Sequence, residues 1–281
     1  MSGSAFDDYL KQWREASPQR PLAWLFLRPD EHVVFGALAA MLREWDKARD
    51  VSEPQVAAAK LGWWREELQR ALAGTAVHPL TQPLFADVRA RSVPLACWTA
   101  AIDASVATLA LPPPADFAAQ LDASMPLASA FAVLETRVWF GAGADATRAA
   151  RVIAHARLVG NACALPAEVG RGRSPLPMNL LARHGLTIEG LAGDGQARRA
   201  ALRDQLAELR RGLDAAARMS GPLTLFRDVG LQHDLTALDR AVRAEDPLAA
   251  LAARVHGRPG LLKTWRAARR WRGTVRSESH T

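Results

Sequence analysis

Leucine recurs at helical spacing in the last third of the chain, where Leu202, Leu206, Leu209 and Leu213 stand three or four positions apart. This spacing puts all four side chains on one face of an α-helix. The apolar residues of the chain are mostly Ala and Leu, which favour helices, whereas residues typical of strands are scarce. We therefore predict an all-α fold.

Prolines and glycines separate the helical runs along the chain. Pro126 is expected to start a new helix after a short preceding one. Pro112–Pro114 is the one candidate domain boundary, and helices of similar character lie on both sides of it. We therefore predict a single domain over residues 1–281, with residues 1–20 and 273–281 as frayed ends.

The formal charge of +7 is spread unevenly. The segment Arg254–Arg276 holds eight Lys or Arg residues and no acidic residue. Nucleic acid, anionic lipid and an anionic substrate all attract such a segment. Trp265 and Trp271 lie in it, which fits a helix at a membrane surface, and no recognised nucleic-acid motif is present. We therefore predict peripheral membrane contact and do not favour nucleic acid.

Targeting signals and cysteine pairs are not evident. Residues 1–20 lack the apolar core of a secretory signal, and the longest apolar stretch, residues 33–42, is too short to span a bilayer. Cys97 and Cys163 show no paired spacing, as expected in a reducing compartment. These patterns predict a cytoplasmic protein, soluble or peripheral at the inner face of the membrane. Three scattered histidines are interpreted as structural: His155, His184 and His233.

Two aspartates stand four positions apart in the segment Arg43-Glu44-Trp45-Asp46-Lys47-Ala48-Arg49-Asp50. Four positions is slightly more than one helical turn, so Asp46 and Asp50 project from one face of a helix. Such a pair suits Mg²⁺, which keeps some waters and shares its remaining positions with phosphate oxygens. The same spacing is common on solvated helix faces, so the rest of the chain decides its meaning.

Four further motifs supply that context. After the aspartates come Ala-Lys-Leu-Gly-Trp-Trp-Arg-Glu-Glu-Leu (59–68) and Ala-Gly-Thr-Ala-Val-His-Pro (73–79). Farther on come Gly-Arg-Gly-Arg-Ser-Pro-Leu-Pro (170–177) and Leu-Leu-Ala-Arg-His-Gly-Leu-Thr (180–187). In this order the motifs resemble the squalene/phytoene synthase family of trans-isoprenoid synthases, over residues 21–187. The double-Trp segment is the most specific part of the match.

The resemblance implies a single all-helical barrel or bundle of the isoprenoid synthase type around an apolar cavity. In the family, two aspartate clusters hold Mg²⁺ ions that grip two prenyl diphosphates, which then couple head to head. Metal ions and arginines stabilise the departing diphosphate, and an apolar cavity keeps the carbocation dry. Carried over to this sequence, Asp46 and Asp50 are metal ligands and Arg43 contacts phosphate or orients a carboxylate. The alternative for Arg43 is a surface ion pair along its own helix.

The second aspartate cluster has no full counterpart. The family pattern, approximately Asn-x-x-Arg-Asp-x-x-x-Asp, falls on residues 161–169, where small or apolar residues replace the Arg and the first Asp. Pro166 also interrupts that helix. The residues that the resemblance leaves on this side are Glu168 as a metal ligand and, as substrate contacts, Asn161, Arg171 and Arg173. Phe226-Arg227-Asp228-Val229-Gly230 reads like the missing piece, but it comes too late in the chain, and we predict a capped turn there.

The sequence leaves three functions open. The first is a prenyltransferase of the squalene/phytoene synthase type, binding a prenyl diphosphate through Mg²⁺ on Asp46 and Asp50, with Glu168, Arg171 and Arg173 partly rebuilding the second side. The second is a non-catalytic relative that binds an isoprenoid lipid or acts as a respiratory-complex assembly factor, as some family members do. The third, a nucleic-acid binder, is the least favoured.

Overall fold

The computed structural model describes residues 4–257 and 260–278, which form α-helices and short 3-10 helices and no strand. The all-α prediction is confirmed. The longer helices are α1 (Ala5–Glu15), α3 (Pro29–Arg49), α4 (Pro54–Leu72), α7 (Leu95–Ala107), α8 (Phe117–Phe140), α9 (Thr147–Cys163), α12 (Gln196–Arg218), α13 (Leu225–Arg243) and α15 (Leu261–Glu278). The shorter ones are α2 (Gln19–Trp24), α5 (Thr81–Ala86), α6 (Val88–Arg91), η1 (Thr108–Ala110), α10 (Leu165–Gly170), α11 (Met178–Arg183), η2 (Glu189–Ala192), α14 (Pro247–Ala252) and η3 (Ala253–His256).

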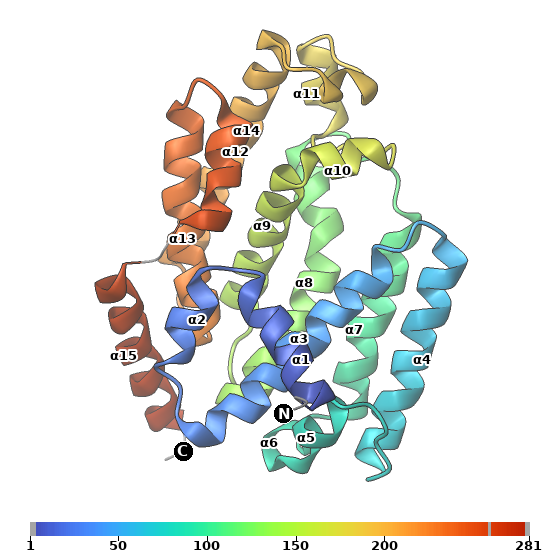
Figure 1. Ribbon diagram of the computed structural model, residues 1–281, viewed down its shortest axis with the longest axis vertical. Coiled ribbons are helices and arrows are strands. Elements are labelled where there is room, and N and C mark those ends of the chain that lie inside the picture. Colours follow the sequence, from blue (N-terminus) through green and yellow to red (C-terminus); the bar gives the residue numbers. More distant parts are fainter. Residues whose placement is uncertain (1–3, 258–259, 279–281) are drawn as a thin grey trace.

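The long helices pack in a closed circuit, with α3 crossing the middle of the molecule (Figure 1). Helix α3 packs on α4 and α7, α7 packs on α8, and α8 packs on α9. Helix α9 continues the circuit to α12 and α13, and α13 packs on α2. The α1–α2 pair returns the chain to α3. This arrangement is the expected helical bundle.

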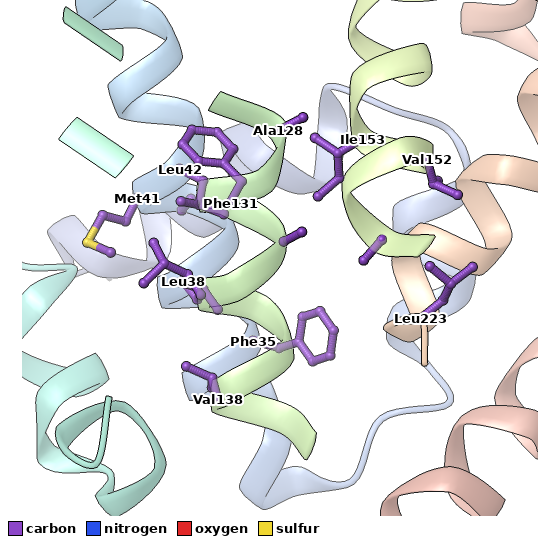
Figure 2. Close-up of a cluster of buried hydrophobic side chains, with 14 of the residues drawn as sticks. Phe35, Leu38, Met41, Leu42, Ala128, Phe131, Val138, Val152, Ile153 and Leu223 are labelled. Atoms are coloured by element: carbon purple, nitrogen blue, oxygen red, sulfur yellow. The ribbon is translucent and has the colours of Figure 1, made fainter. Parts of the chain in front are cut away.

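The centre of the bundle is built from one apolar face of each helix. On α3, Leu38, Met41, Leu42 and Trp45 follow helical spacing and all are buried. Figure 2 shows Leu38 and Leu42 beside Phe131 of α8, while Ile153 of α9 points toward them. A smaller apolar cluster joins α10, α11, η2 and the start of α12, far from the chain ends (Figure 1).

Helix α8 is continuous, so the prediction that Pro126 starts a helix is wrong. Pro126 lies inside α8 on an exposed face, where solvent reaches the carbonyl that loses its intrahelical partner. By length and composition, α8 is also the one candidate membrane-spanning helix among the described residues. Its Phe131, Leu134 and Val138 are buried in the core cluster, which identifies α8 as the central helix of the bundle.

The expected frayed ends are largely helical. Ser4 caps α1 through a capping box, and Leu10 and Trp13 bury the inner face of this helix. The prediction of a frayed segment 1–20 is therefore wrong for residues 4–20. Helix α15 runs to Glu278, which corrects most of the predicted second end, and residues 279–281 lie outside the described residues. The division into one domain stays a prediction.

Candidate functional site

A cavity of about 320 Å³ lies at the centre of the bundle, between α3, α8, α9 and α13. Helices α1 and α2 cover one side of it, and η3 contributes one side chain. Its volume is at the lower end of the range for small-molecule sites. Its lining residues include Trp13, Arg20, Phe35, Leu38, Arg43, Asp46, Phe131, Glu135, Trp139, Ile153, Arg157, Phe226, Arg227, Asp234 and Arg254.

One end of the cavity is aromatic. Phe35 of α3 stacks on Trp139 of α8 at 4.5 Å between ring centroids and meets the edge of Phe226 at 4.8 Å. Phe226 also contacts Trp13 of α1, at 5.0 Å. Behind this wall, Trp271 of α15 packs against Trp139 at 5.3 Å. Four separate helices therefore build an apolar, shape-defined surface.

The wall also carries many charged side chains, with more arginines than acidic residues. Five arginines and three acidic residues line it, an excess of two positive charges at neutral pH. The arginines are Arg20, Arg43, Arg157, Arg227 and Arg254, and the acids are Asp46, Glu135 and Asp234.

Three of the arginines are paired with the three acids. Arg157 of α9 donates through Nη1 to both oxygens of Asp46, at 2.8 and 3.0 Å. Arg227 of α13 donates through Nε to both oxygens of Glu135 on α8, at 3.1 and 3.0 Å. The third pair joins Nε of Arg254 to Oδ1 of Asp234, at 3.1 Å. Each pair joins two elements around the cavity.

The remaining two arginines, Arg20 and Arg43, have no carboxylate partner among the described residues. Arg20 donates to the carbonyl oxygen of Trp13 and lies over the ring of that residue. Burial and the like charges of Arg227, Arg43 and Arg254 lower the pKa of Arg20 to about 9. The positive charges of these two guanidiniums are therefore not neutralised by a carboxylate of the wall.

Asp234 is the most deeply buried carboxyl group of the cavity. Burial raises the pKa of Asp234 to about 6, although Arg254 and Arg227 oppose the shift. Desolvation of the carboxylate therefore outweighs the attraction of two nearby arginines.

The structure separates the predicted site residues. Arg43 and Asp46 line the cavity, and the others do not. Asp50 ends α3 with its side chain 48% exposed. The remaining members lie beyond the cavity wall at the α9–α10 end of the molecule: Asn161, Glu168, Arg171 and Arg173.

Glu168 accepts hydrogen bonds from two arginines of the loop that follows α10. Arg173 donates to both of its oxygens, at 2.8 and 3.0 Å, and Arg171 donates to one at 3.0 Å. The charge of Asp50 acts on Arg173, so the two regions are neighbours.

The donor set does not fit Mg²⁺ as these side chains stand. A Mg²⁺ site needs carboxylate oxygens that are free to face the ion. Both oxygens of Asp46 accept from Arg157, and Glu168 is held by two arginines. Asp50 accepts no hydrogen bond from Arg49, 3.9 Å away, but it lies outside the cavity wall. Within residues 4–257 and 260–278, no three His, Cys, Asp or Glu side chains group in a way that could hold a metal. Guanidinium groups take the positions next to the carboxylates.

Sequence reasoning missed several cavity residues. Arg20, Arg157 and Glu135 belong to no motif, so only spatial proximity reveals them. The segment from Phe226 to Gly230 did carry a signal, but it was interpreted as a capped turn. That prediction is wrong, because the segment forms the first turns of α13, where Arg227 faces the cavity. Asp228 of the same segment instead pairs with Arg270, at 2.7 Å.

The double-Trp segment of α4 packs against the part of α3 that carries Asp46. Trp64 of α4 meets the edge of Trp45 at 6.2 Å, directly beneath the turn that carries Asp46. The buried side chain of Glu67 accepts from the backbone N–H groups of Val77 and His78, at 2.9 Å each. Burial raises the pKa of Glu67, but hydrogen bonds, chiefly from the Thr81 hydroxyl, outweigh this and hold it below its usual value.

His155, His184 and His233 each have a hydrogen-bond partner. His155 bonds to the carbonyl of its own helix at 2.8 Å, and His184 lies 2.9 Å from Asp204. His233 contacts the backbone carbonyl of Arg254 at 3.0 Å. Both cysteines are free, and they are Cys97 and Cys163.

Comparison with known proteins agrees with this architecture. The chain is similar to a crystal structure of a dehydrosqualene synthase in complex with ligand, with a TM-score of 0.72 and 12% identity over 97% of this chain and 96% of that one. It is also similar to squalene synthase HpnC from Alicyclobacillus acidocaldarius, with a TM-score of 0.57 and 16% identity over 99% and 97% of the two chains. At these identities the two structures establish the fold. A search of curated proteins found no match.

The sequence itself matches the squalene/phytoene synthase family model over residues 13–266, which is most of the chain. This match extends well beyond the motifs of residues 21–187 and includes every residue that lines the cavity. The chain therefore belongs to the squalene/phytoene synthase family.

Proposed function

We propose that this protein binds one isoprenoid diphosphate in the central cavity and does not couple two such molecules. The observation that carries the proposal is the division of the cavity wall. Along α3, Phe35 belongs to the aromatic end, and Arg43 and Asp46 lie about two to three turns beyond it, while Arg20, over the Trp13 ring, borders both parts. A ligand with an apolar chain and an anionic end matches this division.

Membership of the family supports an isoprenoid diphosphate as the ligand. The two structural relatives are named as synthases of dehydrosqualene and squalene, and the family resemblance implies prenyl diphosphates as substrates. The aromatic wall around Phe35 and Trp139 suits an isoprenoid chain, while the excess of arginine suits phosphate.

The carboxylates argue against coupling. Head-to-head coupling in the family uses two carboxylate clusters that face each other and hold metal ions. In this chain Asp46 lines the cavity, whereas Asp50 and Glu168 lie outside its wall and next to arginines. A single carboxylate paired with Arg157 supports ligand binding without a two-metal leaving-group site.

Binding and turnover can be measured on the same preparation. The purified protein is titrated with farnesyl diphosphate by calorimetry, with and without Mg²⁺, and released diphosphate and hydrocarbon products are assayed in parallel. We expect saturable binding and no coupled product. Formation of a head-to-head product would establish a working prenyltransferase instead. Absence of binding under every condition would favour the scaffold alternative, a respiratory-complex assembly factor.

We also propose that α15 docks the protein on an anionic phospholipid surface at the inner face of the membrane. Leu261, Leu262 and Trp265 are 64%, 56% and 42% exposed on this helix, and Lys263 and Arg266 extend the same exposed surface. Apolar side chains beside cations complement an anionic lipid headgroup layer.

Several side chains of the basic segment 254–276 are buried or paired. Trp271, predicted as an interfacial residue, is buried against the aromatic wall. Arg254 and Arg270 pair with Asp234 and Asp228. We therefore assign the membrane contact to the exposed first half of α15. Arg258 lies outside the described residues.

A further inference from the structure

The pair formed by Arg157 and Asp46 places a cation beside the aspartate for which the family implies a metal. One nitrogen of Arg157, Nη1, serves both oxygens of Asp46. The guanidinium has five N–H donors, so most of them remain for a ligand in the cavity. Its position over Phe131, 5.7 Å from the ring centroid, holds the group against the cavity wall.

Arg20 and Arg43 add two cations that no carboxylate neutralises within the part of the chain that the structure describes. They come from α2 and α3, so a ligand between them bridges two elements. Burial, and in addition repulsion from Arg227, Arg43 and Arg254, depresses the pKa of Arg20. A bound anion removes this repulsion, because it interacts favourably with every one of these groups.

The charge of the cavity matches a multiply charged anion. Three acids neutralise three of the five arginines, and two positive charges remain. Guanidinium groups bind phosphate oxygens through paired N–H donors, and they remain charged where an amine would lose its proton. A divalent metal at Asp46 would have to displace Arg157 first, and no second free carboxylate lines the adjoining wall around Arg43.

We propose that the phosphate end of the ligand is bound directly by Arg20, Arg43 and Arg157, without a divalent cation. The inference rests on the proposed function, since it concerns the same cavity. It differs from the metal-dependent recognition that the family implies, because the arginines take over the role of the metal. Asp46 then neutralises part of the charge of Arg157 and does not bind a metal.

The first test separates the inference from the proposed function. Binding of farnesyl diphosphate, and of inorganic pyrophosphate as a probe of the charged end alone, is measured by calorimetry in excess EDTA and in excess Mg²⁺. We expect equal affinity for farnesyl diphosphate in both buffers. Binding that appears only with Mg²⁺ overturns the inference and leaves the proposed function standing. No binding in either buffer removes the proposed function as well.

The second test uses Asp46→Asn, for which the two mechanisms predict opposite results. If Asp46 holds a metal, the variant loses binding. If the arginines hold the ligand, the variant frees Arg157 and raises the net positive charge of the cavity, so binding in EDTA becomes tighter. Weaker binding of Asp46→Asn in EDTA overturns the inference. Circular dichroism confirms that the variant is folded.

A third measurement tests whether Arg43 binds the ligand. Arg43→Gln removes an unpaired guanidinium, and we expect affinity in EDTA to fall about 10- to 100-fold, the range for a charge-assisted hydrogen bond. Arg151→Gln is the matched control, because Arg151 lies on α9 with an exposed side chain and does not line the cavity. Equal affinity of these two variants contradicts the assignment.

Discussion

Arg157 and Asp46 lie 111 positions apart in the sequence, yet one guanidinium nitrogen of Arg157 binds both carboxylate oxygens of Asp46. The pair joins α9 to α3 across the cavity wall. It also converts an aspartate that local sequence marks as a metal ligand into the partner of an organic cation. The chemistry available at Asp46 is therefore set by a residue that no motif contains.

This ion pair contributes modestly to stability. The side chains of Arg157 and Asp46 are 16% and 37% exposed, so solvent screens part of the attraction. A double-mutant cycle of Arg157→Gln and Asp46→Asn, measured by urea unfolding, is expected to give a coupling free energy of about 1 kcal/mol. The more exposed pair Arg65–Asp103 serves as control and should give less. A larger coupling in the control would contradict the role assigned to burial.

Glu67 should be a major determinant of stability. Glu67→Ala leaves the N–H groups of Val77 and His78 without their acceptor, so we expect a loss of about 3 kcal/mol or more in the free energy of unfolding. Glu66→Ala, with a side chain 69% exposed, should change it by less than about 0.5 kcal/mol. Because the folded state lowers the pKa of Glu67, its contribution is full above the unfolded pKa and is lost as pH falls. Chemical unfolding at several pH values measures both effects.

Asp234 should make stability depend on pH in the opposite sense. Its pKa is raised from 3.8 to about 6, so the folded state binds a proton more tightly than the unfolded state. This contribution is present below the unfolded pKa and is lost as pH rises through about 6. The melting temperature of Asp234→Asn relative to wild type should therefore increase between pH 4 and pH 7. A flat difference for Asp234→Asn would contradict the raised pKa.

Gly212 of α12 lies close to the side chain of His155 on α9. A Cβ at this position would lie 2.1 Å from Nε2 of the buried His155, so Gly212→Ala requires His155 to move out of a packed site. We expect a loss of about 1–3 kcal/mol, the usual cost of overpacking. Gly62→Ala in α4 meets nothing within 4 Å and should stabilise the protein by about 0.5–1 kcal/mol. Thermal unfolding of the two variants should shift in opposite directions.

The proposed membrane contact predicts a lipid-specific loss. Leu262→Ser and Trp265→Ser on α15 should reduce sedimentation with vesicles that contain phosphatidylserine, and wild type should not sediment with purely phosphatidylcholine vesicles. Val77→Ser removes an apolar side chain that is 60% exposed elsewhere and should have no effect. Equal sedimentation of wild type with both vesicle types would contradict the role of charge.

Local sequence was sufficient for most helices and for the family. Helix hydrogen bonds join residues four positions apart, so the spacing of Leu202, Leu206, Leu209 and Leu213 predicts a buried face before any tertiary contact is known, and all four are buried. The double-Trp segment was informative for a related reason, since Trp64 and Glu67 act within a short stretch of chain. Pro126 shows the limit of such signals, because its effect depends on which face of α8 meets solvent.

The tertiary structure alone decided the charged site. Arg157 meets Asp46, Arg227 meets Glu135 and Trp271 is buried, all through contacts between residues far apart in the sequence. Side-chain charge is visible in the sequence, but its partner depends on how helices cross and on the burial that results. Sequence therefore determined the helices, the family and the Asp46 candidate, whereas packing determined that arginines surround that aspartate.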